Sequence, residues 1–268
     1  MSLDDRFALA GLLVAQAGSM AVHAHENDLL KIESKGPGDL VSETDFAIER
    51  LMRDAIGLQF PEDGIIGEEY GGEHLATGFT WLIDPIDGTV NFARRLGYFC
   101  ISVAVLEDGL PVAAWILDPL RGELFHAGPD GIARLNGKPI RAASETDFGE
   151  AVIGLGFSLR HRPELNGLIV DGLTRAGAEH RRLGAGALCL AHVAAGRLNA
   201  YVEPHMNPWD AVGGLYLAAC AGAVTGDYIG AGGLAQARPF MPPQPRFPRH
   251  CWQVCRRRFP APRCSFCR

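Results

Sequence analysis

Oxygen-bearing side chains gather between residues 81 and 92, and their spacing suits metal chemistry. The apolar segment 81–83 ends at Asp84, Pro85 restricts the backbone of the turn that we expect there, and Asp87 follows on the same side. Two carboxylates that converge in a partly buried turn repel each other unless a cation lies between them. Because the nearby donors are oxygen atoms, with no Cys or His pair among them, the pattern favours a hard ion and indicates Mg²⁺.

Gly88 and Thr89 come next and suit a phosphate group. A glycine followed by the start of a helix exposes backbone N–H groups, which bind phosphate well when a metal already holds it. The alternative interpretation is an Asp-Pro turn followed by an Asp-Gly turn, a common surface element without a functional role.

The apolar periodicity predicts the elements that position these residues. Ser42 or Thr44 can cap one helix, and a short strand at 65–67 delivers Glu68-Glu69 at its end. The strands between 79 and 127 should lie adjacent in one antiparallel sheet. Helices are expected over about 3–28, 44–56, 163–176, 185–195 and 210–221, and strands over 65–67, 80–83, 99–106, 111–117, 123–127, 151–157, 180–183 and 199–203. This order indicates layered α and β structure around two sheets.

The composition is that of a globular protein. The chain has 268 residues, of which 47% are hydrophobic and 21% charged, so disorder, collagen and coiled coil are excluded as global descriptions. The longest charge-free stretches, 7–22 and 211–226, are shorter than the roughly 18 to 20 apolar residues that span a bilayer. Asp4 and Asp5 have the wrong sign for a secretory signal. We therefore expect a cytoplasmic protein without a membrane partner, with its seven cysteines reduced.

Charge is distributed unevenly along the chain. The net charge is −6, but the segment 239–268 holds seven Arg and no acid, so that 31 acidic residues precede it with only 18 basic ones. An acidic body argues against non-specific binding to nucleic acid, and we expect no nucleic-acid partner.

The sequence divides into a domain over 1–233 and an atypical Pro/Arg/Cys-rich tail over 234–268. The tail has no apolar periodicity, so it is interpreted as a disordered basic segment or as the product of a frameshift. Its cysteines could in principle hold zinc, although the eight residues between the two pairs are fewer than in the usual zinc ribbon or finger. These cysteines are Cys251, Cys255, Cys264 and Cys267.

Three separated motifs resemble the inositol monophosphatase family of Mg²⁺-dependent phosphatases. They are Gly67-Glu68-Glu69, Asp84-Pro85-Ile86-Asp87-Gly88-Thr89 and Trp209-Asp210, and further similarity lies at 39–45, 135–140 and 182–187. The resemblance runs from about residue 5 to about Gly233. It implies a layered α+β fold, an αβαβα sandwich of the inositol monophosphatase and sugar phosphatase type.

The resemblance also implies a role for each matching residue. Metal ligands would be Glu68, Asp84, Asp87, Asp210 and the carbonyl group of Ile86. The attacking water would be positioned and activated by Asp45, Glu68 and Thr89. Substrate would contact Asp87, Gly88, Thr89, Gly184, Ala185, Glu203 and Asp210, with Lys35 near the mouth of the site. Plainer interpretations remain open for a few of these: a solvated strand end for Glu203, a turn glycine for Gly184 and a surface residue for Lys35.

The resemblance implies a Mg²⁺-dependent phosphomonoesterase that acts on a small polyol phosphate such as inositol monophosphate, is inhibited by Li⁺ and can form a homodimer. Alternatives with the same chemistry are phosphatases for histidinol phosphate, fructose 1,6-bisphosphate or 3'-phosphoadenosine 5'-phosphate, because the substrate pocket is not shared. An alternative of another class is a non-catalytic regulatory or binding homologue. The intact group of acids favours the enzyme.

The sequence departs from the family pattern in two places. Val212 stands where a smaller Ala or Cys is usual, and after residue 225 Pro-rich sequence replaces the family's last strand and helix. Loss of a strand exposes a sheet edge and would cost several kcal/mol of a typical stability of about 5 to 15 kcal/mol.

Overall fold

The computed structural model describes residues 1–27, 32–36, 39–144, 147–157, 164–234 and 252–254. The side chain of Lys35 and the four tail cysteines lie outside the described residues, as does most of the tail. The boundary between a domain and a tail near residue 233 therefore stays a prediction.

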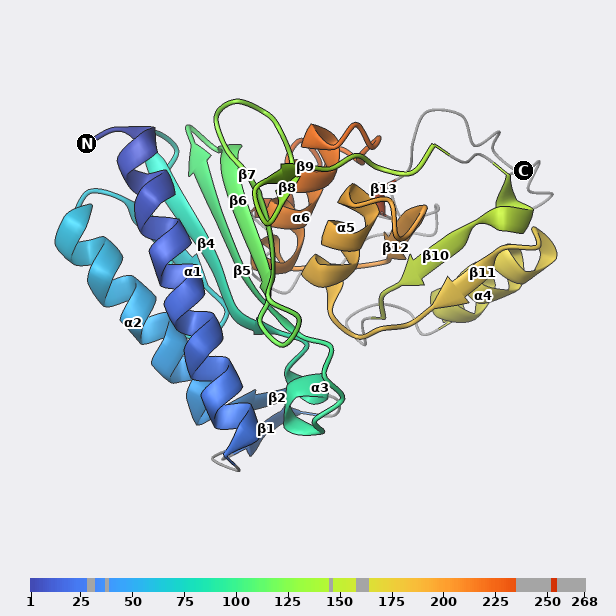
Figure 1. Cartoon of the computed structure of the whole chain (residues 1–268), viewed down its shortest axis with the longest axis horizontal. Helices are drawn as coiled ribbons and strands as arrows, with labels where there is room; N and C mark the ends of the chain where they lie inside the picture. Colours follow the sequence, from blue (N-terminus) through green and yellow to red (C-terminus); the bar gives the residue numbers. More distant parts are fainter. Residues whose placement is uncertain (28–31, 37–38, 145–146, 158–163, 235–251, 255–268) are drawn as a thin grey trace.

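The described chain forms five layers, which confirms the layered α+β fold expected from the resemblance (Figure 1). Helices α1 (Leu3–Glu26) and α2 (Glu43–Gln59) cover the outer face of a seven-stranded sheet. Helices α5 (Gly186–Ala194) and α6 (Pro208–Cys220) lie between this sheet and a four-stranded sheet, whose other face carries α4 (Glu164–Arg175). The order is thus α, β, α, β, α.

The large sheet is antiparallel apart from its first pair. Strand β3 is parallel to β4, and each later strand pairs antiparallel with the one before it, as predicted for 79–127. The strands are β3 (Gly64–Gly67), β4 (Phe79–Asp87), β5 (Cys100–Glu107), β6 (Leu110–Asp118), β7 (Glu123–Ala127), β8 (Arg134–Leu135) and β9 (Lys138–Pro139).

The turn predicted after Asp84 was wrong, because β4 continues to Asp87. Proline has no N–H group to donate to the neighbouring strand. The pairing of β4 with β5 accordingly shifts register between Asp84 and Asp87, where Pro85 lies. This irregularity bends the strand and aims the two carboxylates differently.

The small sheet has the order β11-β10-β12-β13. Strands β10 (Val152–Leu155), β11 (Glu179–Arg181) and β12 (Ala200–Glu203) are parallel, which fits the predicted alternation of helices and strands. Strand β13 (Trp252–Val254) pairs antiparallel with β12. The remaining elements are the hairpin β1 (Ile32–Gly36) and β2 (Asp39–Ser42), the helix α3 (Thr89–Ala93) and the 3₁₀ turn η1 (Phe148–Glu150).

Strand β4 contributes to both apolar cores of the large sheet. Trp81 and Ile83 are buried beneath α1 and α2, whereas Leu82 packs in the core shared with α5 and α6. Because side chains alternate along a strand, Asp84 falls on the same face as Leu82 and is directed toward α6. The strand thus delivers a carboxylate into the layer between the two sheets.

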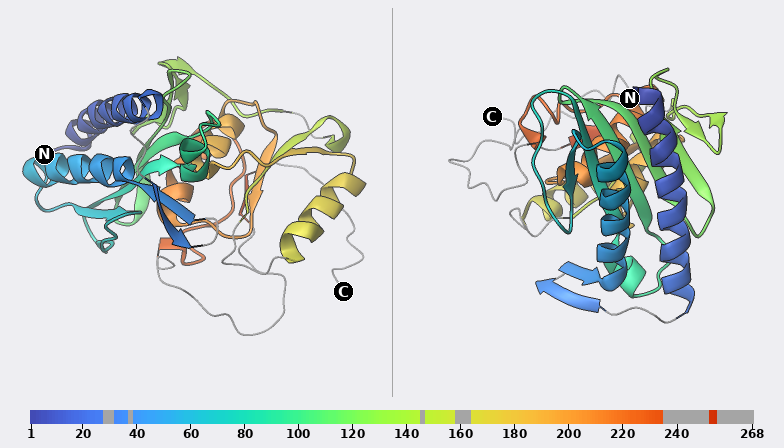
Figure 2. Two further views of the ribbon diagram at one scale, coloured as in Figure 1. Left: turned by 90° about the horizontal axis from the view of Figure 1, so that it is seen from below. Right: turned by 90° about the vertical axis from the view of Figure 1, so that its left-hand side faces the viewer.

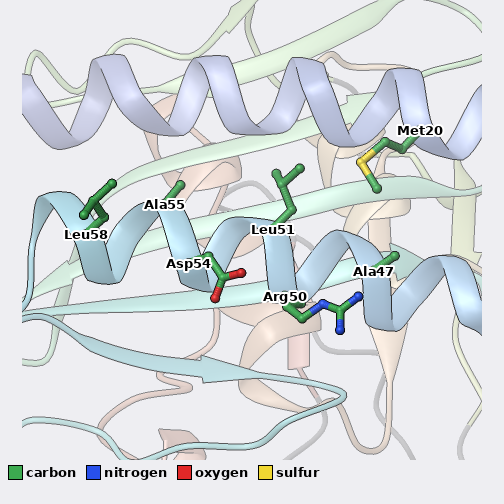
Figure 3. Close-up of a pocket in the computed structure, with 7 residues that line it drawn as sticks. All are labelled: Met20, Ala47, Arg50, Leu51, Asp54, Ala55 and Leu58. Carbon is green, nitrogen blue, oxygen red and sulfur yellow. The ribbon is translucent and has the colours of Figure 1, made fainter.

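Helix α1 is long and apolar enough, by length and composition alone, to cross a membrane. In the structure it lies beside α2 across the large sheet (Figure 2), with Leu13, Val14 and Ala17 buried against that sheet. A core helix of a layered domain has this arrangement. A shallow groove between α1 and α2 is lined by Met20, Ala47, Arg50, Leu51, Asp54, Ala55 and Leu58 (Figure 3).

Candidate active site

Three carboxylates from distant parts of the chain converge between the sheets. Glu68, Asp84 and Asp210 each offer an oxygen atom, and the three oxygens lie within 4.8 Å of one another. Burial, followed by the charges on Glu68 and Asp210, raises the pKa of Asp84 well above its ordinary value. A hard cation bound by these oxygens would remove the repulsion, so the donor set fits Mg²⁺ or a similar ion.

Main-chain hydrogen bonds place Glu68 next to Asp84. The N–H of Glu68 donates to the carbonyl oxygen of Ile83 at 3.2 Å. Gly67 and Gly71 exchange two hydrogen bonds, at 3.0 and 3.1 Å, and so close a tight loop around residues 68–70. The end of β3 and the middle of β4 therefore present their acids side by side.

Asp210 belongs to the first turn of α6. Its Oδ2 accepts hydrogen bonds from the backbone N–H of Asn207 at 3.3 Å and from the Asn207 side-chain amide at 3.2 Å. This capping box fixes the carboxylate at the N-terminal end of the helix, where the helix dipole favours negative charge.

Asp87 lies beside the three acids and caps α5. Its carboxylate accepts the backbone N–H groups of Gly186 at 3.0 Å, Ala187 at 2.8 Å and Leu188 at 3.3 Å. Burial, followed by the charge on Asp210, raises its pKa to about 7, although these hydrogen bonds act in the opposite direction. The acids that converge on Asp84 are Glu68 and Asp210, and Asp87 is not one of this group of three. The short spacing between Asp84 and Asp87 in the sequence does not reveal this arrangement.

Asp45 is fully buried in the first turn of α2. One oxygen accepts the hydroxyl of Ser42 and, at 2.9 Å, its backbone N–H, while the other oxygen is buried without a partner in the described part of the chain. Burial raises the pKa of Asp45 to about 6. Strand β2, which ends at Ser42, packs against α3, and α3 begins at Thr89.

The predicted phosphate segment packs against the predicted substrate loop. Gly88 has a positive φ of 94°, and a Cβ atom there would lie 3.1 Å from the Cβ of Ala185 and from the carbonyl oxygen of Gly184. Within the described part of the chain no side chain caps α3, so its first N–H groups are available to another acceptor there. The Thr89 hydroxyl donates to the carbonyl oxygen of Ile86 at 3.1 Å.

Glu203 at the end of β12 faces this site and is not a solvated strand end. The hydroxyl of Tyr201 donates to its Oε2 at 2.5 Å. Burial raises the pKa of Glu203 to about 8, and the charges of Asp210 and Asp87 act in the same direction.

Sequence reasoning missed several residues that support the site. Asn91 donates from its amide to the carbonyl oxygens of Leu183 at 2.7 Å and Tyr98 at 2.8 Å, and so ties α3 to the substrate loop. The sequence feature that could have pointed to Asn91 is its place as a polar residue between the apolar Val90 and Phe92 at the end of the phosphate motif. Asn207 and Glu49 lie three residues before Asp210 and four after Asp45, but neither spacing distinguishes a supporting residue from a surface one.

The fold and the site define a layered α+β protein with a buried acidic centre between its sheets. The family model described as "Inositol monophosphatase family" matches residues 4–248, beyond the end of the sequence resemblance at Gly233. The chain belongs to the inositol monophosphatase family.

Relatives in this family carry two kinds of name. The chain is 37% identical over 213 residues to "Nus factor SuhB" of Xylella fastidiosa, covering 78% of this chain and 76% of the relative. It is 36% identical over 235 residues to "Inositol-1-monophosphatase" of Rhizobium meliloti, covering 85% and 88%. The solved structure of the Thermotoga maritima IMPase superimposes with a TM-score of 0.76 at 31% identity, covering 84% of this chain and 87% of that one.

Proposed function

We propose that the protein is a Mg²⁺-dependent phosphomonoesterase that hydrolyses a small polyol phosphate, in the first instance inositol monophosphate, in the cytoplasm. The observation that carries the proposal is the convergence of Glu68, Asp84 and Asp210 within 4.8 Å. A binding protein has no physical need for buried acids that repel one another, whereas a site for a divalent ion requires them.

The proposed metal ligands are Glu68, Asp84, Asp87, Asp210 and the carbonyl group of Ile86. When bound, Mg²⁺ would neutralise charge on the phosphoryl oxygens and lower the pKa of a water molecule. The buried carboxylates gain from the ion as well, because its charge offsets the burial and the neighbouring negative charges that raise the pKa of Asp84.

The residues of the chain supply the proton transfer. For the relay, the Thr89 hydroxyl, which donates to the carbonyl oxygen of Ile86 in the structure, would turn its proton to the unpartnered oxygen of Asp45 and take one from the attacking water. A pKa of about 6 for Asp45 leaves it ionised at neutral pH and basic enough to take part. The N–H groups of Gly88, which precedes α3, and of Thr89, which begins it, would orient the phosphate.

Substrate hydroxyls would lie next to Gly184, Ala185 and Glu203. A Cβ atom on Gly186 would lie 2.9 Å from Cε of Met206 and 3.1 Å from the hydroxyl of Tyr201, so the glycine lets these side chains pack closely beside Glu203. Glu203 accepts hydrogen bonds when ionised and donates one when protonated, both of which suit a polyol. Gly184, Ala185 and Glu203, rather than the acid centre, would decide between inositol monophosphate and the alternative phosphate esters.

The experiment measures phosphate release from inositol monophosphate, histidinol phosphate, fructose 1,6-bisphosphate and 3'-phosphoadenosine 5'-phosphate, each with Mg²⁺ and with EDTA. We expect Mg²⁺-dependent release from inositol monophosphate, with Asp84→Asn lowering it by at least about a hundredfold. Release that persists in EDTA, or that survives Asp84→Asn, contradicts the proposal.

The second candidate is a regulatory protein, because relatives at 36–37% identity are named Nus factor, a name for a role other than ester hydrolysis. A folded wild-type protein that binds Mg²⁺ but releases no phosphate from any substrate in the panel would favour it. Li⁺ inhibition, homodimer formation and the absence of a nucleic-acid partner stay predictions.

A further inference from the structure

We propose that Glu49 is the positioning residue that holds Glu68 in the acid centre, and that the metal affinity of the centre depends on it. The inference rests on the proposed function, which takes Glu68 as a metal ligand. Glu49 lies one helical turn after Asp45 on α2 and is not one of the three converging carboxylates.

The carboxylate of Glu49 binds the loop that carries Glu68. Its side chain is fully buried, and its Oε2 accepts the backbone N–H of Glu69 at 2.7 Å. Its Oε1 accepts the N–H of Tyr70 at 3.2 Å. Both bonded amides directly follow Glu68, so the carboxylate fixes the backbone just beyond the proposed ligand.

Arg53 completes this attachment one turn further along α2. Its Nε donates to Oε1 of Glu49 at 2.7 Å, and its Nη2 donates to the carbonyl oxygen of Gly71. Glu49 therefore holds the loop at residues 69 and 70, and Arg53 holds it at residue 71. The guanidinium also compensates the buried negative charge of Glu49.

Gly67 shows how closely the carboxylate is fitted to the loop. A Cβ atom at this position would lie 1.9 Å from Oε1 of Glu49. The carboxylate thus fills the space that any other residue at position 67 would need. The N–H of Glu68, on the adjacent peptide, is used in the hydrogen bond to Ile83. The backbone around Glu68 is in this way fixed from α2 on one side and from β4 on the other.

Residues that orient metal ligands without touching the metal commonly contribute about 10- to 100-fold to affinity. Glu49→Gln tests this role, since the amide keeps the shape but only one of its two polar atoms can accept an N–H bond. Asp54→Asn is the matched control. It removes one carboxylate charge from the same helix, but Asp54 lies at the edge of the outer groove, on the side of α2 away from α1 (Figure 3), and has no ion pair in the described chain.

The probe is Mn²⁺, whose binding to each full-length variant is followed by electron paramagnetic resonance without substrate. We expect Glu49→Gln to raise the Kd for Mn²⁺ at least about tenfold and Asp54→Asn to leave it within about twofold of wild type. Amide exchange at Glu69 and Tyr70 should accelerate only in Glu49→Gln. In the phosphatase assay, the same variant should need more Mg²⁺ for half-maximal activity while kcat at saturating Mg²⁺ recovers, an effect that general loss of stability does not produce.

Equal Mn²⁺ affinity in Glu49→Gln and Asp54→Asn overturns the inference. Should Glu49→Gln not fold, Arg53→Gln replaces it, because Arg53 is 23% exposed and its loss removes the hydrogen bonds that orient the Glu49 carboxylate and hold Gly71. A several-fold rise in Kd supports the role and an unchanged Kd overturns it. Failure of the wild-type protein to bind Mn²⁺ contradicts the proposed function itself, whereas wild-type binding that Glu49→Gln leaves intact contradicts only the role of Glu49.

Discussion

Asp45 and Asp210 occupy the same position in two different helices. Each is the third residue of its helix, and each closes a capping box with the residue before the helix, Ser42 for α2 and Asn207 for α6. Because the cap holds one carboxylate oxygen, forming the helix also fixes the direction of the other. The same hydrogen bonds therefore cap each helix and orient the carboxylate in the site.

Ser42→Ala tests this coupling. Loss of the hydroxyl removes a hydrogen bond from Asp45 and should cost about 1 kcal/mol of stability, measured by urea denaturation. It should also lower kcat several-fold, because Asp45 is then oriented by the backbone N–H of Ser42 without the hydroxyl. Ser2→Ala is the matched control, since Ser2 and Asp5 form the same capping box at the start of α1. A similar loss of kcat in both variants would refute the coupling.

Asp87→Asn separates the cap of α5 from the proposed metal site. The amide oxygen can still accept the N–H groups of Ala187 and Leu188, whereas the NH2 group cannot accept that of Gly186, so we expect a stability loss of about 1 to 3 kcal/mol. Turnover should fall by at least about a hundredfold, because the variant lacks the negative charge. Thermal unfolding and phosphate release measure the two effects, and near-normal turnover with Mg²⁺ would show that Asp87 is not a ligand.

The metal-free protein should lose stability as pH rises from 7 to 8.5. Burial raises the pKa of Asp87 to about 7 and of Glu203 to about 8, and that of Asp84 well above its ordinary value. In this range the folded protein still holds protons that the unfolded chain released near pH 4, so stability is present at lower pH and is lost as these groups ionise.

Thermal unfolding in EDTA measures the effect, with an expected fall in Tm of about 5 °C or more. Histidines with lowered pKa values, such as His192 at about 4, contribute little here because they are largely neutral in both states above pH 7. Added Mg²⁺ should reduce the dependence on pH by compensating the charges. A Tm that rises over this interval would contradict the raised pKa values of Asp84, Asp87 and Glu203.

Sequence reasoning predicts the fold well because strong local signals mark its elements. Ser42 caps α2, the strands over 79–127 have the predicted order, and the last helices alternate with parallel strands. It fails at Pro85, where a motif that is typical of a turn forms an irregularity inside a strand. The competing influence is the pairing of β4 with β5, which resumes at Asp87 and is a tertiary interaction.

The sequence predicts the acids of the candidate site but not the residues that hold those acids and their loops in place. Resemblance to a family identifies Glu68, Asp84 and Asp210 as a group, whereas their individual spacings of 16 and 126 residues give no physical reason for contact. Glu49 and Asn91 escape detection because their role depends on which backbone amides and carbonyls the fold brings near them. Such partners lie outside the local window in which residue patterns are informative.

Gly67→Ala should destabilise the protein through the loop that carries Glu68. The new methyl group would lie 1.9 Å from Oε1 of Glu49, so the carboxylate or the loop has to move. Overpacking of this kind costs about 1 to 3 kcal/mol. Gly57→Ala is the matched control on α2, because a Cβ atom there meets nothing within 4 Å. An alanine in a helix is favoured over glycine by about 1 kcal/mol, so the control should be more stable than wild type. Urea denaturation should show a lower free energy of unfolding than wild type for Gly67→Ala and a higher one for Gly57→Ala. If Gly67→Ala is as stable as wild type, the loop is packed more loosely around Glu49 than its hydrogen bonds imply.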